Sequence, residues 1–266
     1  MTDVKEIATY LDDLLQTSAV QDYAGAVNGL QLSNDVPVTR VAAAVDFSRR
    51  AVEACIENGA NLLIVHHGMF WQGVTPFVGS QYRRIKLLLD NQIAVYSSHL
   101  PLDMHADVGN NVLLAAKLGL TPARGFAHSK GVAIGVAGDA EILTSDLVDR
   151  AKNFVAEYQG SVVVTANTKN RMTRKWGLCT GAGAGSDTLD EARGAGPPAV
   201  GDVLQRALAA LVAHGAVERV VDEEELEDAV LGLLRHLALR VDHHVGGHGD
   251  HAGRLEGRAP ARVDLD

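Results

Sequence analysis

The sequence predicts an α/β protein built from βαβ units, because apolar strands alternate with amphipathic helices along much of the chain. An apolar segment at 38–46 leads into a helix at 48–59, and a second at 61–65 precedes a helix at 83–91. Hydrophobic residues make up 47% of the 266 residues and charged residues 21%, so the chain can bury a sizeable core. We therefore expect parallel strands covered by helices.

The remaining elements of this first part follow from the spacing of apolar residues. The chain begins with a helix at 3–16, where Asp3 and Glu6 fit a capping box. Gly59 ends the helix at 48–59. A further strand is expected at 92–98 and a further helix at 109–119.

A second, smaller group of elements follows. Strands are expected at 131–138, 160–166 and 175–181, and a helix at 144–158 has Thr144 or Ser145 as its N-cap. The stretch GAGAGS (181–186) then leads into another helix. Its backbone amides could cradle a phosphate, but it lacks the lysine of a P-loop, so a tight strand–helix turn is the preferred interpretation.

The composition of the chain changes abruptly after about Asp187. Beyond it there is no serine, lysine, isoleucine or aromatic residue. One interpretation is a low-complexity extension with a helix at 223–240. The other is a tail translated out of frame from GC-rich DNA, since the remaining residue types have G/C-heavy codons. The expected organisation is a lobe at 1–125, a second lobe at 126–190 and an atypical tail at 191–266.

Charge and cysteine content exclude several classes of protein. The net charge of −9 argues against nonspecific binding to nucleic acid or to an anionic membrane. The charged N-terminus is not a signal peptide, and no apolar run is long enough to span a bilayer. Cys55 and Cys179 are too far apart in sequence for a disulfide framework, and we expect both to be inert packing residues. We expect a cytoplasmic protein.

Three successive predicted strands end in polar side chains. Asp46 ends the first strand, His66 and His67 the second, and His99 follows the third, with Asp103 four residues later. Ligands of open parallel sheets collect beyond the carboxyl ends of the strands. We therefore expect these side chains to converge on one crevice.

Imidazoles beside a carboxylate are the mixed ligand set expected for a divalent transition metal. Taken alone, the pair His66–His67 is better explained by one histidine that caps the sheet and one that is solvated. Taken alone, Asp103 is better explained as a turn or helix cap. The combination on adjacent strand ends reverses both preferences and favours a metal site.

Several of these stretches resemble one known family. NGLQL (28–32), HHGMFWQG (66–73), HLPLDMH (99–105), GNN (109–111) and CTGAGAGSD (179–187) resemble the YbgI-like proteins of the NIF-three-like family, often called GTP cyclohydrolase 1 type 2 homologs. The resemblance runs in order over roughly residues 1–190. It implies a two-lobed α/β subunit that binds two divalent ions (zinc, iron, manganese or nickel) in a cleft, usually within a ring-shaped hexamer.

The resemblance also assigns roles to individual residues. His66 and His67 match metal ligands, and Asp103 matches the carboxylate that bridges or joins the pair. His99 matches a histidine near the metals that supports a ligand or acts as a catalytic group for proton transfer. The family completes its site with a later histidine and glutamate, for which His214 and Glu218 of AHGAVE are the candidates here.

That later motif departs from the family pattern. AHGAVE comes about nine residues too early, and the strand that the family places before it is unrecognisable, which predicts an unpaired sheet edge in the second lobe. The cluster HHVGGHGDH (243–251) is a second candidate with no family equivalent. If the tail is out of frame, the site is incomplete.

Two functions remain open at this point. One is a metal-dependent hydrolase acting on a small, perhaps nucleotide-like, substrate, with His99 transferring the proton. The alternative is a non-enzymatic metal-binding or regulatory ring that interacts with other proteins.

Overall fold

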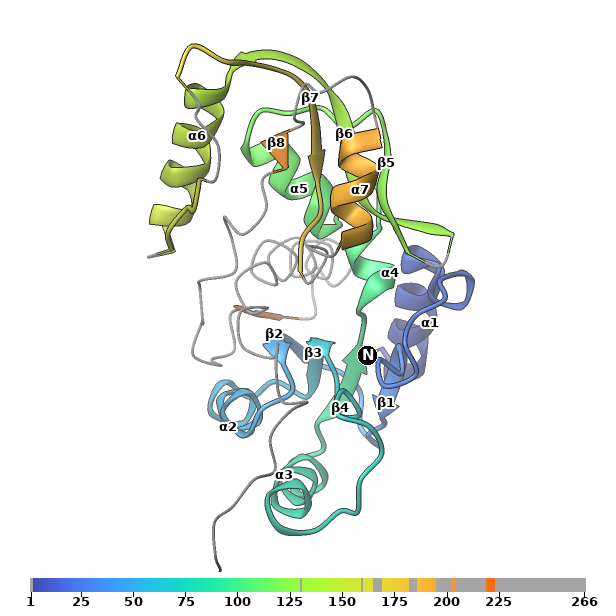
Figure 1. Cartoon of the computed structure of the whole chain (residues 1–266). Helices are drawn as coiled ribbons and strands as arrows, with labels where there is room; N and C mark the ends of the chain where they lie inside the picture. The colour runs from blue at the N-terminus through green and yellow to red at the C-terminus, as the bar shows by residue number, and fades with distance from the viewer. Residues whose placement is uncertain are drawn as a thin grey trace, which may run out of the picture.

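The structure is a computed structural model that describes residues 2–129, 131–158, 160–164, 169–181, 186–194, 202–203 and 219–222. Its strands form two sheets, with the first in the lower half of Figure 1 and the second in the upper half. The α/β fold class predicted from the sequence is confirmed. No helix in the described ranges is both long and apolar enough to cross a bilayer.

The first sheet has the strand order β1-β4-β3-β2-β9. Its central strands β2, β3 and β4 run parallel, as the alternation of strands and helices predicted, and β1 and β9 pair antiparallel at the edges. The strand bounds are Gly29–Leu32 for β1, Arg40–Asp46 for β2, Leu62–His67 for β3, Ala94–Ser97 for β4 and Arg219–Asp222 for β9.

Helices cover both faces of this sheet, which explains why the middle of each central strand is apolar. On one face, α1 (Val4–Leu15) packs Ile7 and Leu11 against alternate side chains of β2, β3 and β4. On the other, α2 (Arg49–Asn58) and α3 (Gly79–Asp90) cover the remaining alternate side chains. The Asp3–Glu6 capping box and the end of α2 at Gly59 are confirmed.

The connection to the second sheet consists of α4 (Leu100–Asp103) and α5 (Asn110–Lys117). The second sheet has the order β5-β6-β7-β8, with bounds Arg124–Ser129, Val132–Leu143, Met172–Leu178 and Asp202–Val203. Apolar residues of α5 and α6 (Thr144–Ala156) pack together with Trp176 and Leu178 of β7. On β5, Nδ1 of His128 lies 2.9 Å from Oε1 of Glu191 of α7 (Ser186–Gly194).

Three sequence-based expectations about this region are wrong. Residues 160–164 form no strand, because the neighbours of β6 in the sheet are β5 and β7. Neither Thr144 nor Ser145 is the N-cap of α6; the cap is Leu143, and the Thr144 hydroxyl instead bonds to the hydroxyl of Thr173 at 2.9 Å.

The third correction concerns the edge of the second sheet. Asp202 and Val203 pair in parallel with Trp176 and Gly177, so this part of the edge is covered by a short strand rather than left unpaired. The predicted helix at 223–240 and most of the tail lie outside the described residues, as do residues 182–185 of the glycine-rich loop.

Candidate metal centre

The candidate site lies at the carboxyl ends of β2, β3 and β4. Parallel pairing of β2 with β3 sets Asp46 beside His67. His99 follows β4 and Ser98 and is the residue directly before α4. Because residues along β3 alternate between the two faces of the sheet, His66 continues the row of Ile64 and His67 the row of Val65. The imidazoles nevertheless meet beyond the strand ends, where the crevice was expected.

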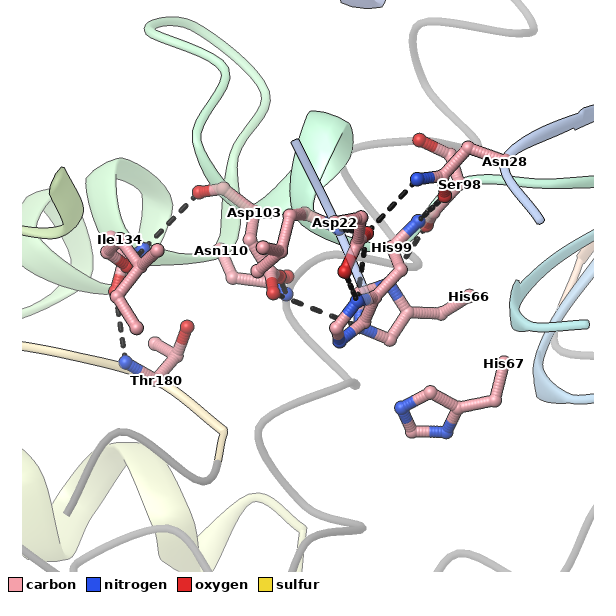
Figure 2. Close-up of polar contacts among 12 residues, drawn as sticks. Asp22, Asn28, His66, His67, Ser98, His99, Asp103, Asn110, Ile134 and Thr180 are labelled. Atoms are coloured by element: carbon pink, nitrogen blue, oxygen red, sulfur yellow. Dashed lines mark hydrogen bonds and ion pairs between the residues drawn. The ribbon is translucent and has the colours of Figure 1, made fainter. Parts of the chain in front are cut away.

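Three imidazoles gather at this place. His66, His67 and His99 each present a ring nitrogen, and these atoms all lie within 4.8 Å of one another (Figure 2). The ring centroid of His66 is 4.7 Å from that of His67 and 4.8 Å from that of His99. His66 and His67 are buried, and the side chain of His99 is 18% exposed.

Each imidazole is oriented by an oxygen atom that can only accept a hydrogen bond. Nδ1 of His66 lies 2.9 Å from the carbonyl oxygen of Ser98, and Nδ1 of His67 lies 2.7 Å from Oδ1 of Asp46. Nδ1 of His99 lies 2.9 Å from Oδ1 of Asp22. In all three rings Nδ1 must therefore carry the proton, which makes Nε2 the lone-pair atom that can bind a metal.

Asp103 adds a carboxylate to the three rings. Its Oδ2 lies 3.8 Å from Nε2 of His66, and its side chain is 12% exposed. The side-chain amide of Asn110 donates a hydrogen bond to Oδ1 (Figure 2). Burial raises the pKa of Asp103 to about 7, although the charge of His99 and the bond from Asn110 act in the opposite direction.

The protonation state of His66 suits metal binding. Burial, together with the neighbouring rings of His67 and His99, holds the pKa of His66 well below its ordinary value, despite the bond to Ser98. A neutral imidazole is the form that coordinates metals. The donor set of three oriented imidazoles and one carboxylate therefore fits a divalent cation.

Asp22 is a site residue that the sequence reasoning missed. Its carboxylate accepts hydrogen bonds from Nδ1 of His99, from the backbone amide of Leu100 and from the side chain of Asn28. Burial raises its pKa, but the bonds from His99 and Asn28 outweigh that effect and lower the pKa from 3.8 to about 2. Asp22 lies outside any segment with a periodic apolar pattern. The NGLQL stretch (28–32), which resembles the family, is the nearby feature that could have drawn attention to it.

The structure thus brings together four of the sequence-predicted site residues, His66, His67, His99 and Asp103. The other two, His214 and Glu218, lie outside the described residues, as does the cluster at 243–251.

Comparisons with known proteins all point to one family. The model of the Duf34/NIF3 (NGG1p interacting factor 3) family matches residues 2–199. A protein of Archaeoglobus fulgidus named GTP cyclohydrolase 1 type 2 homolog is 35% identical over 194 residues, which are 73% of this chain and 75% of the relative. A protein of Deinococcus radiodurans with the same name is 33% identical over 183 residues, 68% of this chain and 67% of the relative.

Solved structures agree with this result. A protein titled ybgI, of unknown function, superposes with a TM-score of 0.60 at 30% identity and covers 72% of this chain and 74% of its own. A Thermus thermophilus protein superposes with a TM-score of 0.58 at 32% identity, and the match covers 68% of this chain and 72% of the other. Reduced HcgD from Methanocaldococcus jannaschii is similar in fold, with a TM-score of 0.63 at 18% identity. The match covers 92% of this chain and 88% of the other.

Proposed function

Since the chain belongs to the Duf34/NIF3 family, we propose that it is a metal-dependent hydrolase that holds two divalent ions in this crevice and acts on a small, nucleotide-like substrate. The name GTP cyclohydrolase 1 type 2 homolog, carried by its relatives, supports a hydrolytic reaction on such a substrate. By resemblance the working form is a homohexamer.

One observation carries the proposal. Three imidazoles with their Nδ1 protons fixed by oxygen acceptors present their remaining nitrogens to one another within 4.8 Å. Without a cation, the lone pairs of His66 and His67 and the buried carboxylate of Asp103 would face one another unfavourably. Zinc, iron, manganese or nickel would each satisfy this donor set.

We assign His66, His67 and Asp103 as ligands, and His99 as the group that transfers a proton beside them. Bound divalent ions would polarise the substrate and lower the pKa of a water molecule. The partner of His99 supports its separate role, because Asp22 is buried and ionised and can stabilise the imidazolium that forms when His99 accepts a proton.

Elemental analysis of the purified protein is the first test, reported as ions per chain. The metal-loaded protein is then screened for turnover of nucleotides and cyclic amides. Asp103→Ala should abolish both metal retention and turnover, whereas Asp107→Ala, at an exposed aspartate four residues later, should preserve both. His99→Ala should retain metal and lose turnover.

Each other outcome has a defined meaning. Metal binding with no turnover of any compound would favour the non-enzymatic metal-binding ring over the hydrolase. Absence of metal from a folded protein, after incubation with zinc and with manganese, would overturn both.

A further inference from the structure

Two aromatic side chains stand directly beside the three histidines. The ring centroid of Trp71 lies 4.1 Å from that of His67, with an angle of 32° between the ring planes, and 4.6 Å from that of His99. Tyr23 meets Trp71 edge-on at 4.9 Å and 88°. Trp71 is thus within contact distance of two of the three imidazoles, and Tyr23 extends the aromatic group outward.

Neither aromatic residue belongs to the hydrophobic core. None of the clusters of buried residues includes them; Tyr23 is 41% exposed and Trp71 is partly buried. By contrast, Trp176, the other tryptophan, is 3% exposed and packs within the second sheet. Partly exposed aromatic rings beside a polar site are typical of ligand recognition rather than of core packing.

The two loops that carry these rings are fixed to each other. The hydroxyl of Tyr23 donates to the carbonyl oxygen of Trp71, and the amide of Met69 donates to Oε1 of Gln31 at 2.6 Å. Nε2 of Gln31 donates in turn to the carbonyl oxygen of Val27 at 2.8 Å. A Cβ atom at Gly68 would lie 2.4 Å from the Gln31 amide, so glycine there permits this approach. The rings are therefore held in place before any ligand binds, which reduces the entropic cost of binding.

We propose that Trp71 and Tyr23 form a recognition surface for a planar heteroaromatic ring of the substrate. Such a ring can stack on or meet the edge of an indole and a phenol, and this places its neighbouring polar atoms beside His67 and His99. The inference builds on the proposed hydrolase and narrows its substrate to compounds with an aromatic heterocycle.

The alternative role of Trp71 is purely to hold the ring of His67. The two roles predict different losses, because a residue that only clamps a ligand histidine affects metal affinity and not the choice of organic compound. Binding of a heterocycle and retention of metal must therefore be measured separately.

The probes are guanosine 5′-monophosphate and uridine 5′-monophosphate, with ribose 5-phosphate as the control that lacks the ring. They are titrated into zinc-loaded protein carrying Trp176→Phe, in which Trp71 is the remaining tryptophan. Both nucleotides should quench the Trp71 emission in a saturable way, and ribose 5-phosphate should not.

Affinity for the nucleotides is then compared by calorimetry among variants with native Trp176. Trp71→Leu should weaken nucleotide binding about tenfold or more, and Trp71→Phe, which keeps a ring, should weaken it less. Phe77→Ala removes another exposed aromatic ring from the same connection to α3 and should leave binding unchanged. Zinc content and circular dichroism of each variant show that the site and the fold persist.

Three results would overturn the inference while the metal centre stands. The first is that neither nucleotide binds zinc-loaded protein at millimolar concentration. The second is that ribose 5-phosphate binds as well as the nucleotides do. The third is that Trp71→Leu lowers zinc affinity and leaves nucleotide affinity unchanged, which would show the clamping role. Failure of the wild-type protein to take up zinc would instead count against the proposed function itself.

Discussion

Asp46 is positioned to set the orientation of one metal ligand, since its carboxylate accepts the Nδ1 proton of His67 at 2.7 Å. Asp46→Asn should reduce zinc affinity about 10- to 100-fold, because partners of this kind fix both the tautomer and the direction of the ligand nitrogen. Competition titration against a fluorescent zinc chelator measures the change. Asp35→Asn, at an exposed aspartate away from the site, is the matched control. Equal affinities in all three proteins would show that the hydrogen bond from His67 to Asp46 does not contribute to metal binding.

Asp22 should make the metal-free protein sensitive to acid. Its pKa is about 2 in the folded protein and near 3.8 when unfolded, so the unfolded state takes up protons first as the pH falls. The stabilisation is complete above about pH 4 and is lost as the pH falls towards 2, with a magnitude of about 2 kcal/mol. Urea unfolding in EDTA at about pH 5 and about pH 2.5 measures the loss. Asp22→Asn should show a smaller difference between the two pH values than Asp13→Asn, an exposed control; equal differences would exclude Asp22 as the cause.

Cys55 should be chemically inert in the native protein. Burial raises the pKa of its thiol from 9.0 to about 12, so at about pH 8 only about one molecule in 10⁴ carries the reactive thiolate. We expect a Cys179→Ser variant to resist iodoacetamide when folded and to react once in urea, as measured by the mass of the intact chain. Rapid labelling of the folded variant would mean that α2 opens frequently.

At this scale the strand-end residues were predictable and their partners were not. His66, His67, His99 and Asp103 were found because polar residues directly follow apolar strands, and parallel strands end at a common edge. Asp22 contacts His99 across 77 residues from a loop without periodicity, so the local pattern carries no signal for that contact. The aromatic pair was missed for the same reason, since Tyr23 and Trp71 come from separate loops.

Among the elements, the start of α5 ties α4 to the second sheet. The buried side chain of Asn111 donates to the carbonyl oxygens of Asp103 and Ile134 and accepts from the amide of Thr180. Asn111→Ala would leave these backbone groups without that partner and should lower the free energy of unfolding by about 2–4 kcal/mol. Urea unfolding measures the loss, with Asn58→Ala at the exposed end of α2 as the control. A loss no larger than the control's would contradict this role.

Helices and parallel strands of the first sheet were predicted well, because each carries an apolar pattern of its own. The antiparallel strands β1 and β5 were missed, since a short segment such as GLQL takes its strand conformation from its partner β4 rather than from local periodicity. The opposite error occurred in the strand expected at 160–166, of which the structure describes residues 160–164: the run VVV has strong strand propensity, yet β6 already has β5 and β7 as its neighbours. Whether a segment forms a strand depends on a neighbouring strand with which it can pair, and the local sequence does not identify that neighbour.

For the whole molecule, metal binding should appear as thermal stability, because the site joins the ends of the first sheet to α4 and, through Asn111, to the second sheet. At a thousandfold excess of zinc over its Kd, the gain is about 4 kcal/mol, or roughly 10 °C in Tm for a chain of this size. His67→Ala should lose most of this shift, and His128→Ala, an exposed histidine on β5, should keep it. Differential scanning calorimetry with zinc or with EDTA measures both. A shift that survives His67→Ala would place the metal elsewhere.

The pairing of β9 with β2 has a consequence for how the protein reaches its native state. Arg40 lies opposite Asp222, so one of the first strands to be synthesised gains its outer neighbour only after nearly all the described chain has been made. Contacts between such distant residues raise the contact order and slow folding, because a very long loop must close before they form. The helices and parallel strands up to β4 can assemble early during synthesis, whereas the sheet is completed only once β9 has been made.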